Sequence, residues 1–164
     1  MREEWRAEQE SATLDAAEQW RHSRSLLDLA RDHMHRGDRV AVMVAGHRCV
    51  GEIVEVARDR IALLDAAGSA ARVDVHVIDV VPLAFTVVER ALSGGRSSAR
   101  TLTFRARLLE LEVAGAPVVI ATALGPDRYT GILGVGADHV VITAADGTET
   151  VISLSAVAFV APVA

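Results

Sequence analysis

Few residues in this chain have a type and spacing that suggest chemistry, and the most regular of them are two aspartates. Asp59 and Asp138 stand in similar polar turns that are 79 residues apart. Carboxylates in matched turns can form a duplicated ligand site. Aspartate is also a preferred turn former, because its carboxylate accepts hydrogen bonds from nearby backbone N–H groups. We therefore expect both side chains to be structural.

Histidine and cysteine offer the next candidates. His33 and His35 lie two residues apart on a predicted helix, where their side chains point away from each other, so we expect a solvated helix end rather than a metal site. Cys49 lies beside Arg48, and a cation can lower a thiol pKa, but a lone strand cysteine is more often a small core residue. We find no nucleophile, zinc or phosphate-loop motif. We predict no catalytic, metal or cofactor residue, and we expect that the protein is not an enzyme.

The most basic segment spans residues 90–107. It contains five arginines and no acidic residue, and these arginines are Arg90, Arg96, Arg100, Arg105 and Arg107. A charge run of this kind is usually a solvated surface. The alternative is a contact with nucleic acid or with an acidic partner, and this segment is where RNA contacts would be sought first.

Both tryptophans, Trp5 and Trp20, fall on the acidic amino-terminal helix. A tryptophan on a polar helix is often a core residue, but tryptophan is also a preferred anchor of protein interfaces. The sequence leaves both interpretations open.

The composition indicates a globular protein with an aliphatic core. The chain has 164 residues, of which 51% are apolar and 4% aromatic, and its formal net charge of −5 opposes a polyanion-binding role. One cysteine excludes an intramolecular disulfide and fits a reducing compartment. There is no signal-peptide pattern, and no apolar run approaches the roughly 20 residues that span a bilayer. We therefore expect a cytoplasmic protein without a membrane partner.

The same order of elements occurs twice along the chain. Apolar spacing predicts a helix over 2–36, with its docked part starting near Leu14 and Gly37 at its C-terminal end. The expected strands of the first copy are 39–45, 48–57, 60–65, 71–76 and 77–81. Those of the second copy are 117–123, 129–136, 139–143, 148–154 and 157–160.

The segment between the two copies is less regular. Residues 84–92 are compatible with a short helix, and the Gly/Ser-rich stretch 93–98 has the composition of a linker. Residues 101–113 are compatible with a helix or with a strand. The expected domains are an N-terminal helical segment (1–36), a first barrel (37–83), a linker and helix (84–114) and a second barrel (115–164).

A helix followed by five short, bent antiparallel strands resembles the Sm-like fold within the SH3-like barrel group. G-D-R-V-A-V and G-E-I-V-E-V-A-R-D-R-I-A-L carry the resemblance in the first copy, and G-I-L-G-V-G-A-D-H-V-V-I carries it in the second. The arrangement also resembles an uncharacterised family of actinobacterial two-repeat proteins. The resemblance implies a mainly β protein with helices (α+β), with two tandem five-stranded barrels, each preceded by a helix, and an N-terminal helix.

The resemblance does not extend to the RNA site of Sm proteins. That site has an Asp-aromatic-x-Asn-like turn and an Arg-Gly pair, and neither is present here. The leading hypothesis is therefore a non-catalytic module for protein interaction and assembly, working as a homo-oligomer or with a protein partner. An RNA-binding regulator that uses the Arg-rich connector is the runner-up. A third class, an enzyme or small-ligand sensor, needs a pocket between the barrels.

Overall fold

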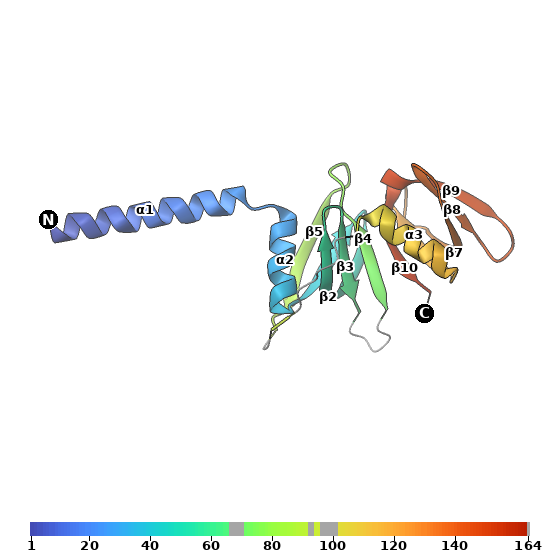
Figure 1. Ribbon diagram of the computed structural model, residues 1–164, viewed down its shortest axis with the longest axis horizontal. Coiled ribbons are helices and arrows are strands. Elements are labelled where there is room, and N and C mark those ends of the chain that lie inside the picture. The colour runs from blue at the N-terminus through green and yellow to red at the C-terminus, as the bar shows by residue number, and fades with distance from the viewer. Residues whose placement is uncertain (66–70, 92–93, 96–101, 164) are drawn as a thin grey trace.

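The computed structural model describes residues 1–65, 71–91, 94–95 and 102–163. Within them the chain is a mixed α+β structure with one antiparallel sheet (Figure 1). The helices are α1 (Arg2–Ser23), α2 (Leu26–Arg36) and α3 (Phe104–Ala114), with a 3-10 helix at Leu154–Ala156. The strands are β1 (Arg39–Val44), β2 (His47–Ala57), β3 (Arg60–Leu64), β4 (Arg72–His76), β5 (Leu83–Glu89), β6 (Val118–Thr122), β7 (Arg128–Val135), β8 (His139–Thr143), β9 (Glu149–Ser153) and β10 (Val157–Pro162).

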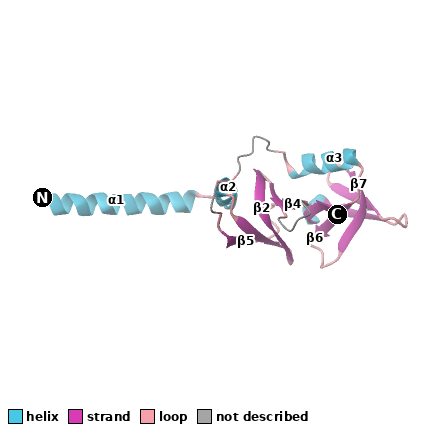
Figure 2. Cartoon of the chain, turned by 90° about the horizontal axis from the view of Figure 1, so that it is seen from below, coloured by secondary structure: helices cyan, strands magenta, loops and turns pink. Residues whose placement is uncertain are grey.

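The amino-terminal helical region consists of two helices, whereas the sequence predicted one. Arg24 adopts an extended conformation, and Ser25 then starts α2 with a capping box, in which Ser25 and Asp28 each accept the other's backbone N–H. Helix α1 has no buried residue, and Leu14 is 66% exposed, so the docked stripe predicted from Leu14 is wrong for α1. It is confirmed in α2, where Ala30 and Met34 are buried. Helix α1 projects away from the rest of the chain (Figures 1 and 2).

The sheet runs in the order β5-β1-β2-β3-β4-β10-β6-β7-β8-β9. We call α2 with β1–β5 the first half and α3 with β6–β10 the second half. The halves join where β4 pairs with β10, with Val75 opposite Phe159 and Asp74 opposite Val160. The sheet is open, because β5 and β9 each pair with one strand among the described residues. The two predicted barrels stay a prediction.

The fifth strand of the first half lies later than predicted. Residues 77–82 form the turn region, and the strand is Leu83–Glu89, which pairs with β1. The predicted strand 77–81 and the predicted helix 84–92 are therefore wrong. Leu83, Phe85 and Val87 alternate with more exposed residues and pack against the core of the first half, which is the period of a strand and not of a helix.

The helical alternative for residues 101–113 is confirmed. Helix α3 begins after Thr103, whose side chain accepts the backbone N–H of Ala106, and it ends at Gly115 in the left-handed conformation. Phe104, Leu108 and Leu111 lie on its buried face. Gly37 ends α2 in the same way, with φ of 77°.

Two interior glycines let the long strands approach their neighbours closely. A Cβ at Gly51 would lie 2.5 Å from the carbonyl oxygen of Leu64, and a Cβ at Gly131 would lie 2.2 Å from that of Thr143. Both distances are below van der Waals contact. A side chain at either position would therefore clash with the neighbouring strand, whereas the irregularity of β2 against β3 lies between Ile53 and Glu55.

Two clusters of buried apolar side chains support the halves. The first contains residues of α2 and β1–β4 together with Ala121, Ala158 and Phe159 of the second half. The second packs α3 against β6–β10. Because the first cluster takes in side chains of the second half, apolar packing crosses the β4–β10 joint.

Candidate functional site

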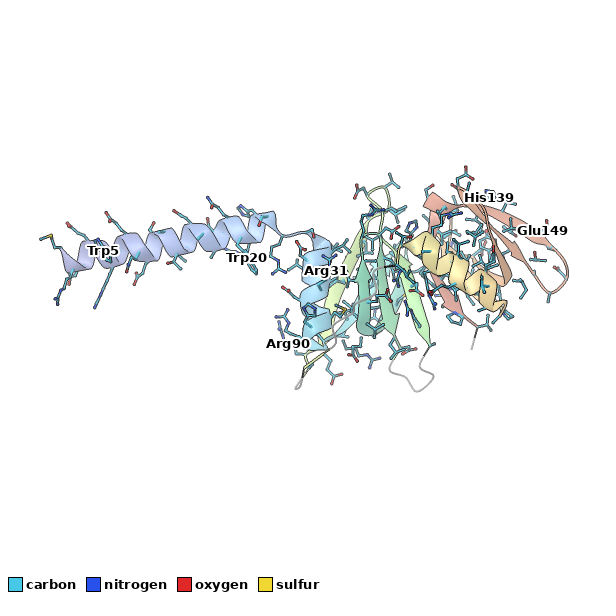
Figure 3. The ribbon with its side chains drawn as sticks, viewed as in Figure 1. Trp5, Trp20, Arg31, Arg90, His139 and Glu149 are labelled. Atoms are coloured by element: carbon cyan, nitrogen blue, oxygen red, sulfur yellow. The ribbon has the colours of Figure 1, made fainter. Side chains whose placement is uncertain are left out.

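The predicted basic segment is divided among several environments. Arg90 is exposed and follows β5 (Figure 3), whereas Arg96 and Arg100 lie outside the described residues. Arg105 donates through Nε and Nη2 to the carbonyl oxygen of Gly136, at 3.3 and 3.2 Å. Arg107 enters a buried ionic cluster. The five arginines therefore do not form one described surface.

The ionic cluster centres on Arg60, whose side chain is completely buried. Arg60 pairs with Glu55 and, at 2.8 Å, with the equally buried Asp74. Its Nε also donates to the carbonyl oxygen of Leu102 at 3.0 Å. A buried charge is tolerated only when it is paired and hydrogen-bonded, and Arg60 meets both conditions.

Two further arginines complete the cluster. Arg72 pairs with Glu55 at 2.8 Å and with Asp74 at 3.2 Å. Arg107 of α3 pairs with Asp74 at 3.0 Å and with Glu110 at 3.1 Å. Asp74 therefore accepts from both halves of the chain. Since the charges neutralise one another, the cluster fixes α3 to β4 and offers little free charge to a ligand.

Backbone and ring contacts strengthen the same joint. Asp59 Oδ1 accepts the backbone N–H of Phe104 at 2.9 Å, at the start of α3. The ring of Phe104 stacks on His76, with centroids 4.2 Å apart. His76 Nδ1 lies 3.0 Å from the carbonyl oxygen of Val157, so it donates to the second half. Burial lowers the pKa of His76, which favours the neutral ring.

The two matched aspartates have different partners. Asp59 reaches α3, 45 positions along the chain, instead of a nearby backbone group. Asp138 is exposed and pairs with the ring of its neighbour His139 at 2.8 Å, which lowers the pKa of the Asp138 carboxyl group. Both roles are structural, but only Asp59 joins the halves. The structure gives no sign that they form one site.

The histidines at the end of α2 are not equivalent. His33 is mostly covered and its Nδ1 lies 2.8 Å from Asp38 Oδ2, whereas His35 is exposed. Asp38 also accepts the backbone N–H of Ala91 at 3.0 Å. These hydrogen bonds lower the Asp38 pKa and tie the end of α2 to the segment after β5. The prediction of a solvated helix end therefore holds for His35 and is wrong for His33.

Trp5 and Trp20 are exposed, at 66% and 59% of their surfaces, so their interpretation as core residues is wrong. Figure 3 shows both on the isolated helix α1. The Trp20 ring lies under the guanidinium group of Arg24, 4.3 Å from the ring centroid. Trp5 and Trp20 are thus available as interface anchors, which is the interpretation that remains.

A cavity of about 290 Å³ lies at the joint between the halves. Its lining comes from both halves and comprises Arg48, Cys49, Val50, Asp65, Val73, Val119, Arg128, Phe159, Ala161 and Pro162. Cys49 is buried, and burial raises the pKa of its thiol to about 11. The thiol is therefore protonated near neutral pH, which fits the predicted core residue better than a nucleophile.

The two edge strands are the other exposed feature. Natural edge strands usually carry charges, prolines or bulges that prevent pairing with another chain. Strand β5 has no charge before Glu89 but has a bulge at Val88, where its register with β1 shifts, and β9 has no charge after Glu149. Val88 and Val151 are 46% and 65% exposed. The two strands lie at opposite ends of the sheet.

An apolar hollow adjoins the β5 edge. It has a volume of about 370 Å³ and is lined by Met43, Ala45, Gly46, Pro82, Leu83 and Ala84. An apolar surface beside a strand with one free edge is a suitable contact site for another protein.

Of the ionic cluster, only Arg107 was singled out from the sequence, and of the cavity lining only Cys49 with its neighbour Arg48. A signal was present for the cluster, because Glu55, Arg60 and Asp74 are charged residues within segments that the alternation of apolar residues predicts as strands. Such residues are buried only with partners. The identity of those partners depends on pairing between distant strands, which the local pattern does not contain.

No protein-family model matches the chain, and no curated protein matches it. Among the described residues, no helix is long and apolar enough to cross a membrane.

Proposed function

We propose that this chain is a non-catalytic interaction and assembly module, built from two tandem five-stranded units of the Sm-like or SH3-like type. Its partner is a protein, and the first candidate is a second copy of the chain. The observation that carries the proposal is the β4–β10 joint, where an edge strand of one unit pairs with an edge strand of the other. Strands β5 and β9 present corresponding edges.

The correspondence of β4 with β9 follows from the register of their neighbours. Val75 pairs with Ile61 on β3, and Ile152 pairs with Val140 on β8. Ile61 and Val140 are 79 residues apart, as are Asp59 and Asp138. Val75 therefore corresponds to Ile152, and the residue before each corresponds in the same way.

The correspondence of β10 with β5 follows from the interior glycines. On β1, Val40 lies opposite Gly51, and on β6, Val118 lies opposite Gly131. Two residues further on, Val42 pairs with Phe85 and Ile120 pairs with Val160. Phe85 therefore corresponds to Val160, and Ala84 to Phe159.

In this proposal, β5 of one copy pairs with β9 of the next copy, in the register that β10 and β4 have in the joint. Phe85 of one copy lies opposite Val151 of the next, and Ala84 lies opposite Ile152. All four side chains are apolar, whereas the joint within the chain includes Asp74. One further step along the same antiparallel register places Thr86 opposite Thr150. The contact is head-to-tail, because it joins different edges of the two copies.

Helix α1 supplies a second interaction surface in this proposal. Most helical stability in proteins comes from packing of an apolar face, and α1, with 22 residues, buries none of its side chains in the chain. Trp5 and Trp20 would anchor it against a protein partner.

The RNA-binding alternative has less support. Of the three described arginines in the basic segment, Arg107 is engaged with carboxylates and Arg105 with a backbone carbonyl. Arg90 is exposed, but one arginine supplies little of the charge that phosphate binding requires.

Sedimentation velocity between 10 and 100 µM tests the proposal, with Val151→Lys as the edge-blocking variant. We expect the wild-type chain to sediment above the mass of one chain, and Val151→Lys to shift it toward the monomer, because a charge on an edge opposes strand pairing. Val113→Lys on α3 is the matched control, since Val113 is 87% exposed and distant in sequence from both edges.

Two differently tagged copies expressed together supply the cellular arm. Recovery of one copy with the other supports the proposal. A chain that sediments as a monomer and captures neither a second copy nor another protein would refute it. Enrichment of RNA in the same capture, lost on Arg90→Gln, would favour the alternative instead.

A further inference from the structure

We propose that the cavity at the joint between the halves binds a small organic anion, a carboxylate or phosphate attached to a compact apolar group. This site is separate from the two sheet edges and does not depend on assembly. Its polar rim holds Arg48 of β2 and Arg128 of β7, one arginine from each half. The β4–β10 pairing brings these two arginines to one cavity.

The positions of the two arginines match along the chain. Arg48 stands three residues before Gly51, and Arg128 stands three residues before Gly131. These are the buried glycines at which β2 and β7 closely approach their neighbouring strands. The two halves thus contribute corresponding guanidinium groups. A planar guanidinium group can donate two parallel hydrogen bonds to a carboxylate or phosphate, and two such groups line this cavity.

Neither arginine is engaged in an ion pair or side-chain hydrogen bond with any residue in the described part of the chain. The contrast with Arg60, Arg72 and Arg107 is direct, because all three are held by carboxylates. Arg128 is instead positioned over the ring of Phe159, with its central carbon 5.2 Å from the ring centroid. Such a contact orients the guanidinium group without neutralising it.

The floor of the cavity is apolar. Phe159 is 3% exposed, and Val73, Val119 and Pro162 contribute further hydrocarbon surface. The Cys49 thiol is neutral, as its raised pKa indicates, so it does not compensate the nearby charge of Arg128. An apolar floor beneath two cations favours an anion with an apolar body over a bare inorganic ion.

Asp65 is the acidic residue of the lining. The Asp65 side chain has an interaction partner of its own. The two arginines and this one carboxylate together give the rim a net charge of about one positive charge. This local balance is opposite in sign to the net charge of −5 of the whole chain. The volume of about 290 Å³ suits a ligand the size of benzoate or phenyl phosphate.

Titration of the full chain with benzoate and phenyl phosphate, followed by ¹H–¹⁵N NMR, tests the site. Benzyl alcohol serves as a neutral probe of similar size. Inorganic phosphate serves as an anionic probe that lacks the apolar group. We expect saturable shifts of amides in β2, β6 and β10 with benzoate or phenyl phosphate, and weaker effects with either comparison probe.

Arg48→Gln and Arg128→Gln are each expected to weaken binding about tenfold or more, since each removes a charge-assisted hydrogen bond. Both side chains are at an exposed rim, so both variants should fold, and thermal denaturation checks this. Arg58→Gln is the matched control, because Arg58 is an exposed arginine outside the cavity lining. No saturable shift up to 20 mM, equal binding of benzyl alcohol, or unchanged affinity in both cavity variants would overturn the proposal.

Discussion

Replacement of Asp74 by asparagine removes the charge that links the ionic cluster across the two halves. Asp74 is completely buried and accepts from Arg60 Nη1 at 2.8 Å and from Arg107 Nε at 3.0 Å. It also pairs with Arg72 at 3.2 Å. Asparagine keeps the volume of the side chain, so the change tests charge rather than packing.

The expected loss follows from what remains around each arginine. Removing one partner of a buried ion pair costs about 3–5 kcal/mol, because the other charge stays buried without full compensation. Here Glu55 continues to neutralise Arg60, and Glu110 continues to pair with Arg107. We therefore expect a decrease in the free energy of unfolding of about 3 kcal/mol, at the lower end of that range.

Urea denaturation at pH 7 measures this loss, with Asp79→Asn as the control. Asp79 is exposed, so its replacement is expected to change stability by less than about 0.5 kcal/mol. Hydrogen exchange should also become faster at Val75 and Val160, on either side of the joint. A decrease in the free energy of unfolding below about 1 kcal/mol for Asp74→Asn would refute the conclusion that the cluster stabilises the joint.

Three further predictions concern stability. Gly131→Ala should destabilise the chain by about 1–3 kcal/mol, because its Cβ would meet the backbone oxygen of Thr143, whereas Gly125→Ala has open space and should be nearly neutral in denaturation. Ala45 has φ of 50°, and Ala45→Gly should raise the free energy of unfolding by about 0.5–1 kcal/mol; a loss of stability would contradict this. Burial lowers the pKa of His76 below its usual 6.5, so the unfolded chain binds more protons and stability falls as pH drops through and below 6.5. Denaturation between pH 7 and pH 5 should show a shallower decline for His76→Gln, and an unchanged slope would count against burial of the neutral ring.

The helices and strands could largely be predicted, because the spacing of apolar residues and the glycines that end helices are features of the local sequence. Alternation identified β1 and β3, and Gly37 and Gly115 marked the ends of α2 and α3. The exceptions also have local causes. Ser25 with Asp28 forms a capping box, which starts a second helix where the sequence predicted one continuous helix.

The arrangement of the candidate sites could not be predicted in the same way. The cavity and the ionic cluster exist because β4 pairs with β10, and that contact joins residues far apart in the sequence. Arg48 and Arg128 look like ordinary strand residues until this pairing places them on one cavity. Residues 84–92 are compatible with a helix in the sequence, and the pairing that makes Phe85 part of a strand joins it to the distant Val42.

The most direct test of the central proposal is disulfide formation between Thr86→Cys on one copy and Thr150→Cys on another, both in a Cys49→Ala background. Opposite residues of an antiparallel pair lie about 4.5–5.5 Å apart, within disulfide range. We predict rapid cross-linking of the mixed variants under mild oxidation, and little cross-linking when Ser153→Cys replaces Thr150→Cys. Absence of the Thr86–Thr150 cross-link in a chain that still associates would contradict the head-to-tail register, and its absence in a monomeric chain would contradict the assembly function itself.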